Sequence, residues 1–158
     1  MTTPHGRLLA LDVGEKRIGV ALSDESQTVA SAYTTLHATP FTVFVQKLSK
    51  ILAMEFVVGI VVGLPLSLNG TEGPQAARIR AFIAALTPLV SQPITTCDER
   101  YTSAEAERIM QEAGLRPEQR KAKIDEVAAS IILQDVLNAR FIRQDTYLAY
   151  KEDEGDVV

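Results

Sequence analysis

The chain has 158 residues, the size of one ordinary domain, and its formal net charge at pH 7 is −4. Hydrophobic residues make up 46% of it and charged residues 23%, which excludes an intrinsically disordered chain. The single cysteine, Cys97, excludes an internal disulfide framework and a paired-cysteine metal site.

Acidic residues are concentrated at the C-terminus. The last eight residues hold one lysine and four acids, so residues 1–150 carry a formal net charge of only −1. We therefore predict one domain over residues 1–150 and a disordered acidic tail over residues 151–158. The N-terminus has no signal-peptide pattern, and the longest apolar stretch, residues 56–64, is too short to span a membrane. We expect a soluble cytoplasmic protein, in keeping with the lone cysteine.

Three apolar segments with short polar connections open the chain and predict an antiparallel meander of strands. They cover residues 7–12, 18–22 and 29–36. Gly14 marks a tight turn after the first segment. Gly19 lies inside the second segment and indicates a bulge or the close approach of another backbone.

Helix and strand patterns then alternate. Thr39-Pro40 predicts a helix start with Thr39 as the cap, and apolar residues at helical spacing follow. The valine-rich run of residues 56–63 is typical of a central parallel strand. The later predicted elements are a helix over 74–90, a strand over 94–99, a short helix over 102–113, a mobile polar loop over 115–123 and a last helix over 124–143.

This order predicts an α/β fold of the ribonuclease H-like type. Three antiparallel strands are followed by parallel strands that are joined through helices by right-handed crossovers. The result is a five-stranded mixed sheet flanked by helices.

Acidic residues occur at positions where a charge is costly to bury. Asp12 ends the first apolar strand, and Asp98 and Glu99 close the last one. Neighbours in a strand point to opposite faces, so only one of Asp98 and Glu99 can face the same site as Asp12. Asp125 lies on the apolar stripe of the last helix, where a carboxylate needs a cation.

Each acid also has a purely structural explanation. Asp12 could cap the turn at Gly14, the acids at 98–99 could pair with Arg100, and Asp125 could be favoured by the helix dipole. The alternative is a shared site, because acids at the ends of two strands and one helix can converge at one edge of the sheet. Such a set of oxygen ligands suits Mg²⁺ or Mn²⁺, which can assist phosphodiester hydrolysis.

Basic residues accompany these acids in the sequence and could position a phosphate backbone. Ordinary solvated side chains are the alternative at each position. The predicted nucleic-acid-binding residues are Lys16, Arg17, Arg100, Arg120, Lys121 and Lys123.

Four blocks of sequence resemble the YqgF family, also called RuvX. They are LALDVGEKRIGVALSD (9–24), VVGLPLSLNGTEGPQA (61–76), DERYTSAEAE (98–107) and KIDEVAASIILQDVL (123–137), in the family's order. The resemblance implies a fold similar to Holliday-junction resolvases and a nuclease for the 5′ end of precursor 16S rRNA or for DNA junctions. It also implies Asp12, Glu99 and Asp125 as catalytic residues and metal ligands, with Asp98 as the alternative ligand.

One departure from the related resolvases concerns the metal. They carry an acid at the end of the fourth strand, where this chain has GLPLS. We therefore expect weak or substrate-dependent binding of Mg²⁺ or Mn²⁺. Precursor rRNA and branched DNA both remain candidate substrates, and a homodimer would suit symmetric cutting of two strands.

Two other functions compete with a nuclease. The DxG turn after the first strand also opens actin-like ATPases, but those need two copies of the fold and this chain has room for one. The stronger alternative is a non-catalytic RNA-binding factor for ribosome assembly.

Overall fold

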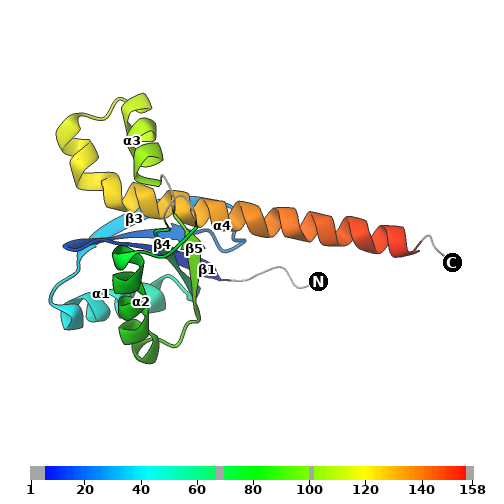
Figure 1. Ribbon diagram of the computed structural model, residues 1–158, viewed down its shortest axis with the longest axis horizontal. Helices are drawn as coiled ribbons and strands as arrows, with labels where there is room; N and C mark the ends of the chain where they lie inside the picture. The colour runs from blue at the N-terminus through cyan, green and yellow to red at the C-terminus, as the bar shows by residue number, and fades with distance from the viewer. Residues whose placement is uncertain (1–5, 67–69, 100–101, 156–158) are drawn as a thin grey trace.

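The computed structural model describes residues 6–66, 70–99 and 102–155, with the backbone alone at 102–103 and 140–155. The strands lie in the first two thirds of the chain, together with two helices, and the last third is helical (Figure 1). In chain order the elements are β1 (Arg7–Val13), β2 (Arg17–Ser23), β3 (Ala30–His37), α1 (Phe41–Met54), β4 (Val57–Leu64), α2 (Pro74–Leu86), a short 3-10 helix (Thr87–Leu89), β5 (Ile94–Asp98), α3 (Thr102–Glu112) and α4 (Pro117–Gly155).

The strands form one mixed sheet in the order β3-β2-β1-β4-β5. The β1–β2 and β2–β3 pairs are antiparallel, whereas the β1–β4 and β4–β5 pairs are parallel. The predicted meander and the predicted α/β fold are therefore confirmed. The carboxyl ends of β1, β4 and β5 meet at one edge of the sheet.

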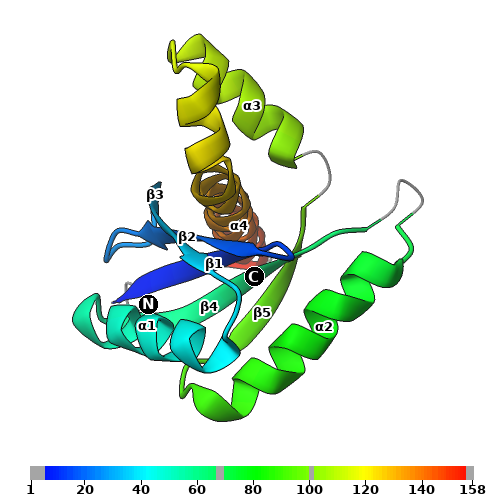
Figure 2. The same ribbon diagram turned by 90° about the vertical axis from the view of Figure 1, so that its left-hand side faces the viewer.

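Helices α1 and α2 cover one face of the sheet, and α4 crosses the other (Figure 2). Large apolar side chains fill the α1/α2 side, among them Leu11, Val20 and Phe44. The α4 side includes the alanines Ala10, Ala21 and Ala129 among larger residues such as Leu133. Small side chains let a helix axis approach a sheet closely, so α4 lies near the strands.

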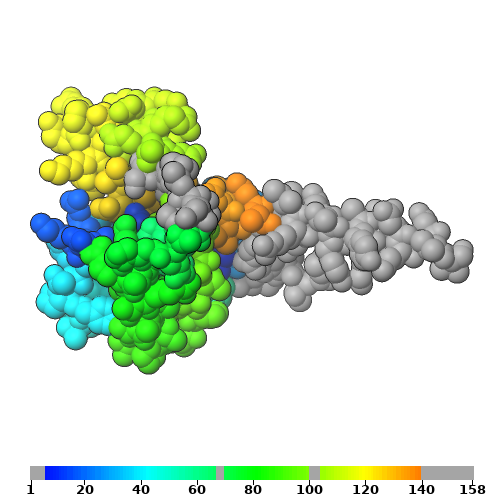
Figure 3. Space-filling view, viewed as in Figure 1, coloured from blue at the N-terminus to red at the C-terminus, as the bar shows by residue number. Residues whose placement is uncertain are grey.

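Helices α3 and the first turns of α4 form a lobe beside the sheet (Figure 3), and the C-terminal part of α4 extends away from the body (Figure 1). Gly114, shortly after the end of α3, has a positive φ of 79°, a backbone conformation that suits a glycine ending a helix. Within the described residues, no helix is both long enough and apolar enough to cross a membrane.

Three predicted local features are wrong. Helix α1 begins at Phe41 after Pro40, without a side-chain cap, so Thr39 does not cap it. Residues 117–123 are helical rather than a mobile loop, because Pro117 suits a first helical turn and the polar residues after it are good helix formers. Helix α2 ends at Leu86, since Pro88 lacks the N–H group that would continue it.

Helix α4 also continues beyond its predicted end, to Gly155. Residues 151–155 of the predicted tail are thus helical in the structure. The division into a domain over 1–150 and a tail over 151–158 stays a prediction.

Candidate active site

Acidic side chains gather where β1 and β5 end. Asp12 is the last residue but one of β1, and Glu99 directly follows β5. Alternate residues of a strand share a face, so Asp12 lies on the α4 face with Ala10, and Glu99 lies on it with Cys97. By the same alternation Asp98 points to the opposite face. The structure therefore brings Glu99, and not Asp98, to Asp12.

Strand β4 lies between β1 and β5, so Glu99 has to reach across it. Gly63 of β4 provides the room, because a Cβ atom there would lie 2.5 Å from Glu99 Oε2 and 2.6 Å from Ile132 Cδ1 of α4. The side chains of Glu99 and Asp12 share a hydrogen bond. Gly63 is not among the residues predicted from the sequence, and its signal there is a glycine within a run of valines.

Burial keeps a proton on this carboxyl pair. It raises the pKa of Asp12 from 3.8 to about 6, an effect that the hydrogen bond with Glu99 reduces and the Asp125 charge increases. Burial also raises the pKa of Glu99 from 4.5 to about 8, and the neighbouring Asp12 charge adds to this rise. Near neutral pH Glu99 therefore retains its proton and donates it to the Asp12 carboxylate.

Asp125 reaches the site through the closest contact between α4 and the sheet. Gly19 of β2 is the antiparallel partner of Asp12, and a Cβ atom at Gly19 would lie only 1.9 Å from the Asp125 backbone oxygen. The close approach predicted for Gly19 is thus confirmed. Any larger residue there would push away the turn of α4 that carries Asp125.

The Asp125 carboxylate is paired with Arg17, the first residue of β2. Arg17 Nε lies 3.2 Å from Asp125 Oδ2. That oxygen is buried, yet it accepts no hydrogen bond, so the guanidinium neutralises the charge without an aligned bond. A buried carboxylate oxygen in this state is well suited to a cation.

The other predicted basic residues divide into two groups. Lys16, Lys121 and Lys123 are exposed, so their ammonium groups are accessible to a phosphate group of a bound ligand. Arg120 instead ties α4 to α3, with Nε donating to Glu107 Oε1 at 3.1 Å and another nitrogen donating to the Leu115 carbonyl at 2.8 Å. The predicted Arg100 lies outside the described residues.

The acids fit a hard divalent cation by their chemistry, since they offer only oxygen ligands and one buried oxygen without a hydrogen bond. They are not assembled in advance. In the part of the chain that the structure describes, no three His, Cys, Asp or Glu side chains are already arranged to hold a metal ion. A proton on the Asp12–Glu99 pair and the Arg17 guanidinium neutralise these carboxylates instead.

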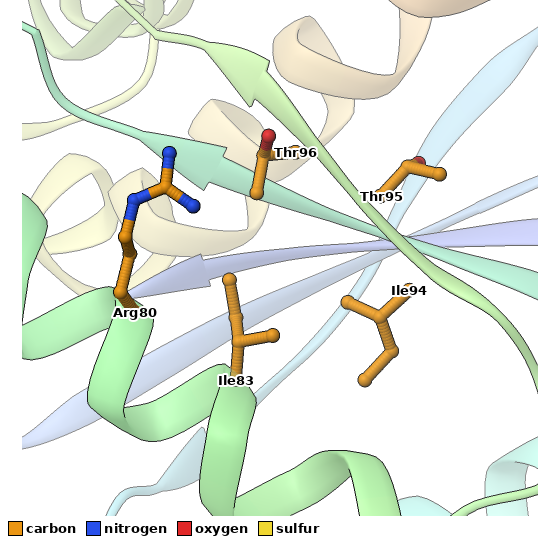
Figure 4. Close-up of a pocket in the computed structure, with 5 residues that line it drawn as sticks. All are labelled: Arg80, Ile83, Ile94, Thr95 and Thr96. Carbon is orange, nitrogen blue, oxygen red and sulfur yellow. The ribbon is translucent and has the colours of Figure 1, made fainter.

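A hollow of about 490 Å³ lies away from these acids, between α2 and β5 (Figure 4). Arg80, Ile83 and Thr96 are among the residues that line it. Arg80 Nε donates to both carboxylate oxygens of Glu72 at 2.9 Å, so its charge is already satisfied. The described side chains that line this hollow include no acid, histidine or cysteine.

Residues 6–139 match the family model described as RuvX, Holliday junction resolvase. The chain belongs to the RuvX family. The match includes Asp12, Glu99, Asp125 and Arg17. It ends near the point where α4 leaves the body, so the sheet and its covering helices are the family's shared part.

RuvX relatives cover nearly the same length. A "Putative pre-16S rRNA nuclease" of Roseiflexus sp. (strain RS-1) is 49% identical over 140 residues, which are 89% of this chain and 99% of the relative. A protein of the same name from Chloroflexus aggregans (strain MD-66 / DSM 9485) is 46% identical over 133 residues, or 84% of this chain and 94% of the relative.

Solved resolvases share the fold of this RuvX chain. RuvC of T. thermophilus in complex with a Holliday junction substrate aligns with a TM-score of 0.51 at 14% identity, over 87% of this chain and 96% of RuvC. The fowlpox virus Holliday junction resolvase aligns with a TM-score of 0.50 at 11% identity, over 84% of this chain and 99% of that chain. The architecture is therefore the ribonuclease H-like one of the resolvases.

Proposed function

We propose that this RuvX protein is a nuclease that hydrolyses phosphodiester bonds of structured nucleic acid with the help of a divalent cation. The observation that carries the proposal is the convergence of Asp12 and Glu99 across Gly63, beside Asp125, whose Oδ2 atom is buried. Nothing in a purely structural role requires acids from two strands and a helix to meet at one edge of the sheet. Their repulsion and burial are unfavourable unless a cation or a proton compensates them.

Asp12, Glu99 and Asp125 would hold Mg²⁺ or Mn²⁺. The cation would activate water for attack on the phosphorus and stabilise the leaving oxygen. Glu99 has to release its proton before it can bind a cation, which favours metal binding at higher pH. Asp98, on the opposite face of β5, is the weaker candidate ligand.

Exposed cations near the acids would hold the nucleic-acid backbone. Lys16 lies between β1 and β2, and Lys121 and Lys123 lie on the turns of α4 that precede Asp125. Phosphate contacts of this kind position a substrate without reading its sequence. Arg120 supports this surface indirectly, because it fixes α3 against α4.

The 5′ leader of precursor 16S rRNA is the substrate that the relatives' names favour, and the cytoplasm is the matching compartment. The family description favours a second candidate, the four-way DNA junction. A homodimer would suit the second candidate, because both strands of a junction are cut. A non-catalytic RNA-binding role is the competing function.

A cleavage assay tests the proposal. Labelled precursor-rRNA leader, single strand, duplex and four-way junction are incubated with Mg²⁺ or Mn²⁺ and with wild type or Asp12→Asn. We expect metal-dependent cutting by wild type, and Asp12→Asn should lose at least about a hundredfold in rate while still binding substrate. Glu25→Gln, at an exposed turn beyond the opposite sheet edge, serves as the control that removes a charge without loss of cutting.

The outcomes separate the candidates. Preferential cutting of the leader or of the junction identifies the substrate class. Substrate binding by wild type without cutting under any metal condition would contradict the nuclease and support the assembly factor.

A further inference from the structure

We propose that Arg17 is an internal counter-ion that competes with the metal ion for Asp125, so that metal binds only when the guanidinium leaves this carboxylate. The inference rests on the proposed function, because it concerns the same acidic site. It assigns a role in metal affinity to a residue that is not itself a metal ligand.

The fold holds Asp125 in place and leaves Arg17 free to move. The contact between Gly19 and the Asp125 backbone fixes the turn of α4 against β2. Arg17 lies two residues before Gly19 on the same face of β2, so its side chain lies beside Asp125. The Arg17 side chain is 46% exposed, whereas that of Asp125 is 22% exposed. The guanidinium can therefore swing into solvent without displacing a packed group.

The geometry of this pair differs from that of a bidentate salt bridge. Arg80 and Glu72 form one in the same molecule, with Arg80 Nε donating to Glu72 Oε2 at 2.9 Å and Arg80 Nη2 donating to Oε1. Arg17 Nε lies 3.2 Å from Asp125 Oδ2, but this buried oxygen accepts no hydrogen bond. Bidentate geometry is what makes arginine–carboxylate pairs strong. The Arg17–Asp125 pair lacks it and is the more easily replaced.

Charge compensation explains why a cation is needed there at all. The charge of Asp125 contributes to the raised pKa of Asp12, so the two carboxylates interact. A second negative charge beside this pair is unfavourable without a positive partner. Arg17 supplies that partner in the metal-free protein, and a divalent cation at the same carboxylate would be repelled by the guanidinium.

Substrate binding would relieve this competition. A phosphate near β2 offers the Arg17 guanidinium a second anionic partner, which frees Asp125 for the metal. Because coupling between two binding events is reciprocal, metal would then strengthen substrate binding by the same factor. The weak, substrate-dependent metal binding expected from the sequence would have Arg17 as its physical cause.

Mn²⁺ binding to the full chain, measured by calorimetry and by the loss of the free Mn²⁺ electron-spin signal, tests the inference. Arg17→Gln should bind Mn²⁺ about tenfold more tightly than wild type, within the usual range of coupling between sites. Arg78→Gln is the matched control. Arg78 also pairs with a single acid, the exposed Glu15, and its loss should change the affinity by less than about twofold.

Thermal unfolding provides a second measurement that does not depend on activity. Arg17→Gln leaves Asp125 without a counter-ion, so it should melt below wild type in EDTA and gain more from Mn²⁺ than wild type gains. If the variant is unfolded in EDTA, Mn²⁺ should refold it, as circular dichroism would show. Failure of Mn²⁺ to refold it would overturn the inference.

The results separate this inference from the proposed function. Equal or weaker Mn²⁺ binding by Arg17→Gln, with Asp12-dependent cutting by wild type, would overturn the competition and leave the nuclease standing. Absence of Mn²⁺ binding in both proteins, together with absence of cutting, would overturn both.

Discussion

The two faces of the sheet are built by different rules. The face under α1 and α2 is filled with large apolar side chains, and Phe41, Phe44 and Phe82 pack there with ring centroids 5.6–6.2 Å apart. The face under α4 depends on the absence of side chains, at Gly19 and at Gly63. The face under α1 and α2 contributes stability by burying large apolar side chains. On the face under α4, the two glycines let α4 approach closely and leave room for Glu99.

This difference explains why the acids lie on the α4 side. An acid under α1 or α2 would lose its hydration to a continuous apolar core. On the α4 side the backbone of Asp125 comes within contact of β2, and Glu99 crosses β4 over a glycine. The face with glycines at its closest contacts is therefore the one that can bring carboxylates from three elements together.

Among substitutions, the largest expected effect on stability concerns the face under α1 and α2 (the apolar face). Phe44 is 1% exposed, and Phe44→Ala should lower the free energy of unfolding by about 3–5 kcal/mol, because it leaves a cavity between α1 and the sheet. Urea unfolding measures the loss. Since the site is on the other face, the remaining folded molecules should cut substrate at the wild-type rate at low temperature.

Val43→Ala is the control, because Val43 lies on the same helix and is 39% exposed. It should lower stability by less than about 1 kcal/mol. A Phe44→Ala variant whose cutting falls by more than its folded fraction would show that the two faces are coupled, against this prediction.

Gly19→Ala should have a smaller effect on stability and a larger one on function. A Cβ atom 1.9 Å from the Asp125 backbone oxygen cannot be accommodated by a side-chain rotation, so α4 must shift. We expect a loss of about 1–3 kcal/mol, as for other overpacked sites, and loss of cutting even among folded molecules. Urea unfolding and single-turnover cleavage of the same preparation separate the two effects.

Gly73→Ala is the matched substitution, since a Cβ atom there meets no other atom within 4 Å. It should change neither the free energy of unfolding nor the cleavage rate noticeably. Wild-type cutting by folded Gly19→Ala would contradict the requirement for close approach of α4.

The sequence predicts the apolar face better than the face under α4, because the first depends on periodic bulky residues and the second on contacts between separate elements. Periodic bulky residues are a direct signal, so the meander, the valine-rich β4 and the apolar stripe of α1 are all predicted from pattern. The loop predicted over 115–123 fails because polar residues are compatible with an exposed helix, here held by the Arg120–Glu107 pair. Contacts between separate elements decide such segments, and local pattern does not contain them.

The candidate site shows the same limit. The sequence marks Asp12, Glu99 and Asp125 as unusual acids, and the pleat of β5 selects Glu99 over Asp98 only once the register with β4 is known. The crossing over Gly63 and the pairing of Arg17 with Asp125 depend on distances between elements far apart in the chain. No residue spacing in the sequence encodes those distances.

A further expected effect is the pH dependence of stability in the metal-free protein, and it belongs only to the face under α4, which carries the acids (the acidic face). The pKa of Asp12 is raised from 3.8 to about 6 and that of Glu99 from 4.5 to about 8. An acid with a raised pKa binds its proton more tightly in the folded state, so its contribution is present below the ordinary pKa. The contribution is lost as pH rises through the folded value. In EDTA the free energy of unfolding should therefore fall between about pH 4 and about pH 8.

Urea unfolding in steps of pH measures this decline, and Glu99→Gln should remove most of it because glutamine does not titrate. Glu25→Gln, in the exposed turn before β3, should retain the decline. In Mn²⁺ the free energy of unfolding should instead rise with pH, because the cation binds the ionised carboxylates and its affinity increases as they lose their protons. A decline of the same size in Glu99→Gln would show that the pH dependence of stability arises outside the Asp12–Glu99 pair. The face under α4 would then not owe this pH dependence to its carboxyl pair.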